Sequence, residues 1–372
     1  MSTVQCQGPL CAPGAAGGGA GDAPVQGRAD GGPRSAHRAV LSVEVVRLAE
    51  ACVAALSRPL HVVDCTVGAG GHARAVLAAL PAGSRLLGLD LDPAALELAE
   101  QTLSDLPADR ACRLVRANFR DLAEVARREA MVPADFVLFD TGVSSMQLDQ
   151  PERGFSFRQD GPLDMRYGPD VVRTAADLLD SLSERALADV LYRFGEERAA
   201  RRIARRIVTG RPWSGTQALA EAIAETLGRP RIGRVHPATR SFQAIRSVVN
   251  EEMASLQRGL AGAASILGAG GLLVVIAFES LSDRLVKNFV RSTSRHCICP
   301  VGTPECRCRF EPVFEPRGWD LVRPAAAEVA RNPRSRSARL RAARRTAAPW
   351  RAEAVEWGIG AGVGNGRGGF GR

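Results

Sequence analysis

Lysine is nearly absent from this chain of 372 residues, in which Lys287 is the only lysine among 49 basic residues and the others are arginine. We interpret so strong a bias as an effect of the gene's base composition and assign it no function. The chain also lacks any apolar run near the roughly 20 residues that a membrane-spanning helix needs, so the sequence predicts a soluble protein without a membrane segment. A hydrophobic fraction of 45% is ordinary for a globular protein, and the length allows one to three domains.

The nine cysteines are too scattered for a secreted disulfide scaffold. Cys52 and Cys65 lie in apolar stretches, which is typical of buried thiols in a reducing compartment. Residues 1–36 lack the apolar core of a secretory signal and are rich in Gly and Ala, which predicts a disordered extension. Asp22 and Asp30 make this extension a poor organelle transit peptide. The sequence leaves two locations open, the cytoplasm if the source is bacterial and a mitochondrial or plastid matrix if it is eukaryotic.

The net charge of +9 is concentrated near the C-terminus. Residues 331–372 contain ten arginines against Glu353 and Glu356, which leaves the remainder of the chain nearly balanced. We therefore expect a basic, Gly-rich tail over 347–372. Such a tail is either a solvated segment or one that binds nucleic acid through phosphate contacts.

Short apolar runs alternate with helical patterns from residue 59 onward. The runs predicted to be strands are LHVVDC, RLLGLD, CRLVRANF, DFVLFD and GLLVVIAF. Strands that are apolar on both faces and alternate with helices predict a parallel sheet covered on each side. Between about residues 150 and 262 only helical patterns occur, and one of them runs from 241 to 260 as SFQAIRSVVNEEMASLQRGL. The predicted fold class is α/β, with a helical insertion after the fourth strand of the sheet.

Polar residues and glycines follow the predicted strands at their carboxyl ends, where open parallel sheets bind ligands. Asp64 precedes the loop Gly68-Ala69-Gly70-Gly71, and Asp90, Asn118 and Asp140 end the next three strands. Asp90 is placed to accept hydrogen bonds from ribose hydroxyls. The pattern Gly68-x-Gly70-x-x-Ala73 also fits a dinucleotide site, so the loop alone leaves a nicotinamide enzyme and an S-adenosylmethionine enzyme open.

Asp64 and Asp140 favour the second alternative, because carboxylates repel a pyrophosphate and attract a sulfonium and an ammonium group. Each acid taken singly is also explained as a helix cap or a turn residue. Acids at the ends of three strands of one sheet are harder to explain in that way.

Seven segments together resemble the RsmH (MraW) family. They are DCTVGAGGH, LGLDLDP, FDTGVSSMQLDQPERGFSFRQDGPLDMR, FGEERAARRIARRIV, HPATRSFQAIRSVVNEE, GGLLVVIAFESLSDRLVKNF and NPRSRSARLRAA. The resemblance extends over about residues 37–346 in collinear order. It implies an S-adenosylmethionine-dependent methyltransferase that modifies the N4 amine of a cytidine in small-subunit (16S-type) ribosomal RNA. The implied fold is a Rossmann-like class I methyltransferase domain in two parts, 37–149 and 263–346, with the insertion 150–262 binding RNA.

The resemblance also implies a set of cofactor-binding residues. These are Gly70, Gly71 and His72 at the methionine end, Asp90 at the ribose, Phe119 at the adenine, and Asp140 and Gln147 closing the site. A helix-start role is the plain alternative for His72. Asp140 is the expected catalytic acceptor near the amine. The reaction depends on orientation of the reacting atoms, and the cytidine must leave any stack to enter the pocket.

The segment ERGFSFRQDGPLDMR, residues 152–166, is the most distinctive part of the resemblance. Its arginines suit phosphates, and its phenylalanines suit stacking on an unpaired base. The expected substrate-binding residues are Arg153, Phe155, Phe157, Arg158, Asp164 and Arg166. The alternative is a charged rim over the core of the insertion. A second basic face is predicted at helical spacing by Arg201, Arg202, Arg205 and Arg206.

The sequence Ala277-Phe278-Glu279-Ser280 departs from the family pattern, which has His where this chain has Glu279. This departure puts any role of that His in doubt and keeps a rival open, a non-catalytic RNA-binding assembly factor with the same fold. A nicotinamide dehydrogenase is disfavoured, because no set of residues for hydride transfer is evident. The expected partner is small-subunit ribosomal RNA, free or in the assembling subunit, and a homodimer is left open.

Four cysteines fall within twelve residues, as Cys297-Ile298-Cys299 and Cys306-Arg307-Cys308. They could form a zinc site, but the C-x-C spacing is tighter than that of the usual ligand pairs. The sequence therefore favours reduced thiols in a surface loop and no metal.

Overall fold

The computed structural model describes residues 39–107, 109–228, 235–300, 302–315, 321–355 and 357. Residues 37–372 form one unit, separate from residues 1–36. The predicted N-terminal extension and the last part of the predicted basic tail lie outside the described residues. No helix within the described ranges is long and apolar enough to span a membrane.

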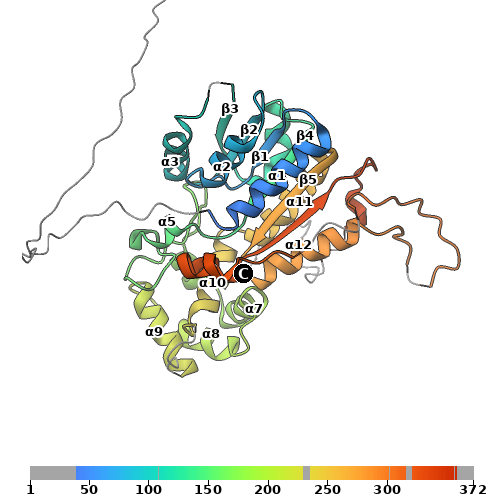
Figure 1. Cartoon of the computed structure of the whole chain (residues 1–372). Helices are drawn as coiled ribbons and strands as arrows, with labels where there is room; N and C mark the ends of the chain where they lie inside the picture. Colours follow the sequence, from blue (N-terminus) through green and yellow to red (C-terminus); the bar gives the residue numbers. More distant parts are fainter. Residues whose placement is uncertain are drawn as a thin grey trace, which may run out of the picture. The chain divides into compact units, whose positions relative to one another are not determined.

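Six strands form one sheet in the order β3-β2-β1-β4-β5-β6 (Figure 1). They are β1 (His61–Asp64), β2 (Arg85–Asp90), β3 (Ala111–Arg116), β4 (Ala134–Asp140), β5 (Leu267–Ala277) and β6 (Arg339–Arg344). The pairs among β1 to β5 are parallel, and β6 runs antiparallel to β5. The order reverses between β1 and β4, so the ends of these strands flank the switch point of a Rossmann-like sheet. The predicted α/β fold is confirmed, and β6 is an addition to it.

Helices cover both faces of the sheet. One face packs against α1 (Ser42–Leu56), α2 (Gly71–Ala79) and α3 (Pro93–Leu103). The other packs against α4 (Leu122–Arg128), α11 (Glu252–Ile266) and α12 (Ser280–Thr293). In β4, Phe136 and Leu138 enter the first core and Val137 and Phe139 the second. Successive side chains of a strand point to opposite faces, which is why the strands are apolar throughout.

In its described residues, the insertion contains five α-helices that share a third core. They are α6 (Ala175–Ser181), α7 (Glu184–Gly195), α8 (Ala200–Thr209), α9 (Thr216–Leu227) and α10 (Thr239–Val249), of which α7 to α10 lie together in Figure 1. Side chains before two of them fix where the helices begin. Thr174 and Asp177 form a capping box at α6, and Ser183 accepts a hydrogen bond from Ala186 N at α7. The shorter helices of the described residues are α5 (Ser145–Leu148) and α13 (Ala326–Arg331).

The single helix expected over 241–260 is two helices, because the chain turns at Asn250 and Glu251. Glu251 has φ 49°, in the left-handed region. The Asn250 side chain donates to Met165 O at 2.7 Å and accepts from Tyr167 N at 2.8 Å, which fixes the turn. After it, α11 packs with the sheet through residues of the second core. The boundary expected at residue 262 therefore lies inside a helix of the sheet domain.

Much of the C-terminal basic charge lies in folded structure. Arg341 of β6 is 7% exposed and binds Asp283 of α12, with Nε to Oδ1 at 2.6 Å. Arg345, also 7% exposed, donates to the carbonyls of Ala264 and Val313. Farther on, Trp357 stacks on Phe289 with ring centroids 5.5 Å apart. The expectation of a basic tail from 347 is thus wrong for its first described residues, which complete a core.

Candidate active site

A glycine-rich loop connects β1 to α2 at the carboxyl edge of the sheet. Gly68 and Gly70 have φ of +53° and +84°, a region that favours glycine. A Cβ on Gly70 would also lie 3.2 Å from Ala99 Cα of α3, so a side chain there would push the loop from the helix. The loop therefore places backbone, without side chains, directly beyond β1.

Asp90 ends β2 beside this loop and is bonded to it. Its Oδ2 accepts from Gly68 N at 2.9 Å, and its Oδ1 accepts from Asp92 N at 3.0 Å. Burial raises the pKa of Asp90, against the effect of these amide hydrogen bonds. Each carboxylate oxygen keeps a further lone pair, so Asp90 can still accept from a ligand's hydroxyls.

Asp64, His72 and Asp140 converge from β1, the start of α2 and the end of β4. Asp64 is 1% exposed and His72 is 6% exposed. His72 Nε2 lies 3.4 Å from Asp140 Oδ2, an ion-pair contact without hydrogen-bond geometry. Asp64 Oδ2 and Asp140 Oδ1 are buried and have no hydrogen-bond partner. Buried polar atoms are nearly always paired, so this group of acceptors fits a polar or cationic ligand.

The charges of this group favour a cation. Burial raises the pKa of Asp64 to about 7, although His72 opposes the rise. For His72, burial disfavours the charged form, but the contact with Asp140 and the charge of Asp64 outweigh it and raise its pKa. A nearby cation favours the ionised carboxylate, whereas a pyrophosphate would add to the repulsion. The carboxylate oxygens of this group thus fit a sulfonium and an ammonium group.

A cavity of about 400 Å³ opens beside the ends of β2 and β3. Its lining residues are Leu91, Ala117, Asn118, Arg120, Asp121, Asp170 and Arg258. The Phe119 ring, expected at the adenine, instead packs edge-on against Phe139 at 5.6 Å and lies close to Gly259. Ala117 and Asn118, which precede it, and Arg120 and Asp121, which follow it, line the cavity.

Gln147 and Arg153 both bind Asp92, a residue that the sequence reasoning did not single out. Asp92 is 3% exposed and caps α3 through Ala94 N. Its Oδ2 accepts from Gln147 Nε2 at 3.0 Å and from Arg153 Nη1 at 2.6 Å. The signal was the pair of acids in LGLDLDP, where the second acid precedes a proline as helix caps do. Gln147, just before the insertion, and Arg153, near its start, thus tie this part of the chain to the helix that follows Asp90.

Most of the other expected substrate-binding side chains contact the insertion itself. Phe155 is 7% exposed and stacks on Tyr167 at 5.4 Å. Phe157 lies 4.8 Å from Phe242, centroid to centroid. Asp164 and Arg166 bind each other at 2.8 Å. Arg158 is the exposed member of the six expected residues. The packing of Phe155 and Phe157 matches the alternative of a rim over the insertion's core.

The basic face expected on the insertion lies along α8. Ile203 and Ile207 of this helix are buried, and Arg201, Arg202 and Arg205 on its other side are exposed. Arg206 is half-buried, with its guanidinium carbon 5.5 Å from the Trp213 ring centroid. The ion pairs of this face are loose, as between Arg205 and Glu184 at 3.4 Å. Loose exposed pairs stabilise little, which leaves these cations available to a polyanion.

Glu279, which stands where the family pattern has His, belongs to a buried charge cluster. Arg246 is 7% exposed and donates to Glu279 Oε1 and, through Nε, to Glu252 Oε1 at 2.7 Å. Tyr167 OH donates to the same Glu252 oxygen at 2.7 Å. Burial raises the pKa of Glu279, while Arg246 opposes the rise. The carboxylate of Glu279 thus joins the end of β5 to α10 and α11.

Comparisons with known proteins agree with this architecture. The sequence pattern of the MraW methylase family matches residues 34–346. A ribosomal RNA small subunit methyltransferase H from Dehalococcoides mccartyi is 45% identical over 287 residues, covering 77% of this chain and 81% of that protein. The protein of the same name from Methylocella silvestris is 47% identical over 336 residues, covering 87% and 91%.

Among solved structures, NSun6 from Pyrococcus horikoshii with SFG is 11% identical, covers 82% of this chain and 51% of that chain, and has a TM-score of 0.35. So weak a likeness adds nothing to what the strand order establishes. The family pattern, in contrast, extends over all six strands of the sheet and over the insertion. The chain belongs to the MraW methylase family.

Proposed function

We propose that this protein transfers a methyl group from S-adenosylmethionine to the N4 amine of a cytidine in small-subunit ribosomal RNA. The observation that carries the proposal is the pair of buried, unpartnered acceptors Asp64 Oδ2 and Asp140 Oδ1 beside the glycine loop. They suit a cationic methyl donor at the switch point of the sheet. Relatives named ribosomal RNA small subunit methyltransferase H support the class of substrate.

In the proposed site, Asp90 accepts from the ribose hydroxyls, and the loop of Gly68, Gly70 and Gly71 brings backbone close to the donor. Asp64 and His72 lie toward the methionine end of the cofactor, and Ala117 and Asn118 line the part of the site that would hold its adenine. When bound, S-adenosylmethionine supplies an electrophilic methyl group. The chain's task is then orientation, which for a well-aligned pair contributes about 7–11 kcal/mol to lowering a barrier.

Asp140 is the proposed acceptor for the amine. The lone pair of an exocyclic cytosine amine is delocalised into the ring, so the nitrogen is a poor nucleophile. A carboxylate that accepts a hydrogen bond from the amine directs the nitrogen toward the methyl group and stabilises the positive charge that develops on it. The Asp140 side chain is 22% exposed, so a base entering the site can reach it.

The rival function, a non-catalytic assembly factor, drew its support from Glu279. The ion pair between Glu279 and Arg246 gives that carboxylate a structural role. The replacement of the family's His by Glu279 is then no argument that the protein lacks catalytic activity. Titration calorimetry with S-adenosylmethionine and with NAD separates the enzyme from the rivals. Binding of the first alone is expected.

The direct test is mass spectrometry of nucleosides from small-subunit RNA of cells with and without the gene. We expect N4-methylcytidine in the first RNA and its loss from the second. Purified chain and labelled S-adenosylmethionine should restore it on particles, and comparing free RNA with assembling subunits identifies the form that is recognised. A methyl group on another atom would overturn the N4 assignment.

Asp90→Ala is expected to weaken S-adenosylmethionine binding about ten-fold or more, because hydrogen bonds to a charged acceptor contribute about 1.5–3 kcal/mol. Titration calorimetry measures the change. Asp105→Ala is a matched control, since Asp105 is exposed and pairs with Arg74 away from the strand ends. Equal affinity of Asp90→Ala and the wild type would remove Asp90 from the site.

Asp64→Asn is expected to stabilise the free protein above pH 7 while weakening cofactor binding. The folded pKa of Asp64 is about 7, above its ordinary value of 3.8. The folded state therefore binds more protons between these values, and the Asp64 contribution to the free energy of unfolding falls as pH rises from about 4 to 7. The Asn side chain does not ionise, so the free energy of unfolding of Asp64→Asn does not fall in this way as pH rises.

Thermal melts at pH 5 and pH 8 check this expectation. The melting temperature of Asp64→Asn should exceed that of the wild type by about 2–4 °C at the higher pH and by much less at the lower. Affinity for S-adenosylmethionine at pH 8 should fall about ten-fold, as for loss of a charged partner. A melting difference of the same size at both pH values would contradict the role of ionised Asp64.

A further inference from the structure

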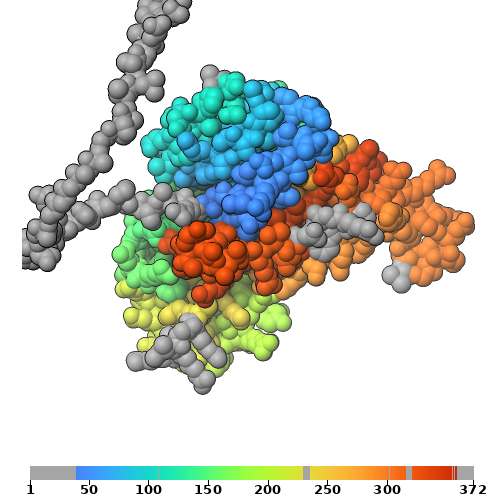
Figure 2. All heavy atoms as spheres, in the orientation of Figure 1, coloured from blue at the N-terminus to red at the C-terminus, as the bar shows by residue number. Residues whose placement is uncertain are grey.

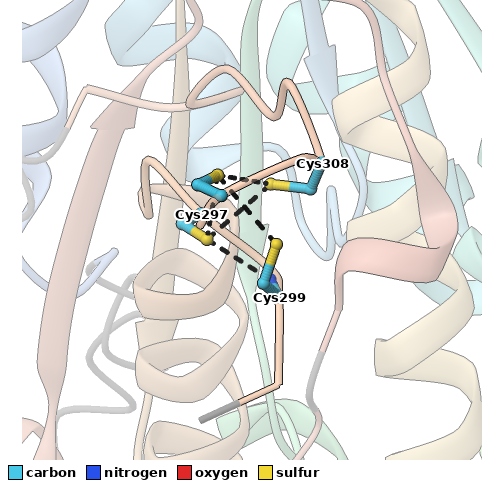
Figure 3. A group of neighbouring side chains, drawn as sticks. Cys297, Cys299 and Cys308 are labelled. Atoms are coloured by element: carbon cyan, nitrogen blue, oxygen red, sulfur yellow. Dashed lines mark hydrogen bonds between the residues drawn. The ribbon is translucent and has the colours of Figure 1, made fainter. Parts of the chain in front are cut away.

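Four cysteine side chains converge in the segment between α12 and Phe314, which forms an isolated β-bridge with Arg345. The sulfur atoms of Cys297, Cys299, Cys306 and Cys308 all lie within 4.8 Å of one another. Figure 3 shows the side chains of Cys297, Cys299 and Cys308 pointing toward a common centre. The four thiols come from two C-x-C pairs that the chain turn brings face to face. The sequence alone favoured separate reduced thiols, because it did not show that turn.

The sulfur spacing fits one tetrahedral ion. A Zn–S bond is about 2.3 Å, so sulfurs at the corners of such a site lie about 3.8 Å apart. Four of the six sulfur pairs are separated by 3.4 Å (Cys306–Cys297), 3.5 Å (Cys306–Cys308), 3.7 Å (Cys308–Cys297) and 4.0 Å (Cys299–Cys306). All exceed the roughly 2.0 Å of a disulfide, and these cysteines are free.

Two backbone N–H groups donate hydrogen bonds to cysteine sulfurs, which stabilises the thiolate form. Ile298 N donates to Cys308 Sγ at 3.4 Å, and Cys299 N donates to Cys297 Sγ at 3.3 Å. Such donors stabilise metal-bound thiolates in the outer shell of a site.

The segment that carries the cysteines has little else to order it. Residues 294–312 contain no helix or strand among those described, and in Figure 2 the orange segment after α12 projects at the edge of the view. Ile298 and Cys308 contact the second core, and Phe310 is 5% exposed in it. These contacts fix one side of the segment, whereas Pro300 and residues 302–307 around its turn are exposed.

We propose that Cys297, Cys299, Cys306 and Cys308 bind one Zn²⁺ in a structural site. Four thiolate ligands fill a tetrahedral shell and leave no position for water or substrate, so the ion orders the segment and takes no part in methyl transfer. Its two positive charges offset the repulsion among four thiolates at this spacing. The inference does not depend on the proposed function.

Metal analysis of the purified full-length chain tests the proposal. The wild type, produced with zinc and iron both available, should contain about one zinc per chain after dialysis, as a tightly bound structural ion does. Cys306→Ser with Cys308→Ser should reduce the content at least ten-fold. Cys112→Ser is the matched control, because Cys112 is an exposed thiol on β3, and it should keep the zinc.

Cobalt gives a readout on the wild type that does not depend on variants. Co²⁺ in place of Zn²⁺ should show the intense visible bands of tetrahedral thiolate coordination. Iron in place of zinc, a disulfide pair, or four titratable thiols without metal would each overturn the proposal. Trypsin tests the ordering role: chelation should speed cleavage after Arg307 and Arg309 at least ten-fold, and equal rates with and without metal would refute it.

Discussion

Asp140→Asn is expected to slow methyl transfer to small-subunit RNA at least 100-fold, because a positioned acid or base contributes about 10²–10⁴ in rate. Asparagine has the shape of aspartate but lacks the charge that stabilises the amine as it gains a positive charge. Asp140 N–H donates to Thr66 Oγ1 at 2.7 Å, a backbone contact that the substitution retains. The change should therefore leave the fold intact. Single-turnover rates at saturating cofactor measure the effect.

The design separates two roles for this carboxylate. If Asp140 served only to bind the cofactor, raising the S-adenosylmethionine concentration would restore the rate of the variant. We expect the rate to stay low at saturation, and Asp105→Asn, on an exposed surface, to react as the wild type does. Recovery of the full rate at high S-adenosylmethionine would assign Asp140 to cofactor binding alone.

The positions of the site's acids were predictable because they follow from periodic patterns. Strands apolar on both faces mark a covered parallel sheet, and the carboxyl ends of its strands meet at one edge. Asp64 and Asp90 end adjacent strands in the observed register, with Asp64 opposite Gly88 two residues before Asp90. Asp140 ends β4 on the other side of β1. No long-range contact had to be known to place these three residues.

Charge partners that are distant in sequence were not predictable in this way. Arg153 binds Asp92 across 61 residues, and Arg341 binds Asp283 across 58. An arginine in a basic segment has the same local pattern whether it contacts solvent, phosphate or a buried acid. The assignment of Arg153 to RNA used composition, whereas burial and partner decide the role.

The break between α10 and α11 shows the same limit for a helix. The apolar spacing continues through Asn250 and Glu251, so periodicity predicts one helix. The turn is fixed by the Asn250 side chain, which donates to Met165 O and accepts from Tyr167 N, residues of the segment 152–166 and its neighbour. A side chain's tertiary partners override the local pattern here.

Arg153→Ala is expected to destabilise the protein by about 2–3 kcal/mol, because it leaves a buried carboxylate without its charged donor. Arg153 is 22% exposed and Asp92 4%, and Arg153 Nη2 also donates to the carbonyls of Arg166 and Tyr167, each at 3.1 Å. Asp92 caps the helix after Asp90, so cofactor affinity should fall together with stability. Denaturant unfolding and calorimetry measure the two effects.

Arg158→Ala should behave oppositely, since Arg158 is exposed and none of the ion pairs in the described residues includes its guanidinium. Stability and cofactor affinity should match the wild type, whereas RNA affinity should fall. If Arg158 meets one phosphate, the slope of log affinity against log salt should become shallower by about 0.7–0.9. The double variant should show both losses independently, as expected of sites without shared partners. If Arg153→Ala lost RNA affinity but kept the stability of the wild type, Arg153 would instead be assigned to RNA binding.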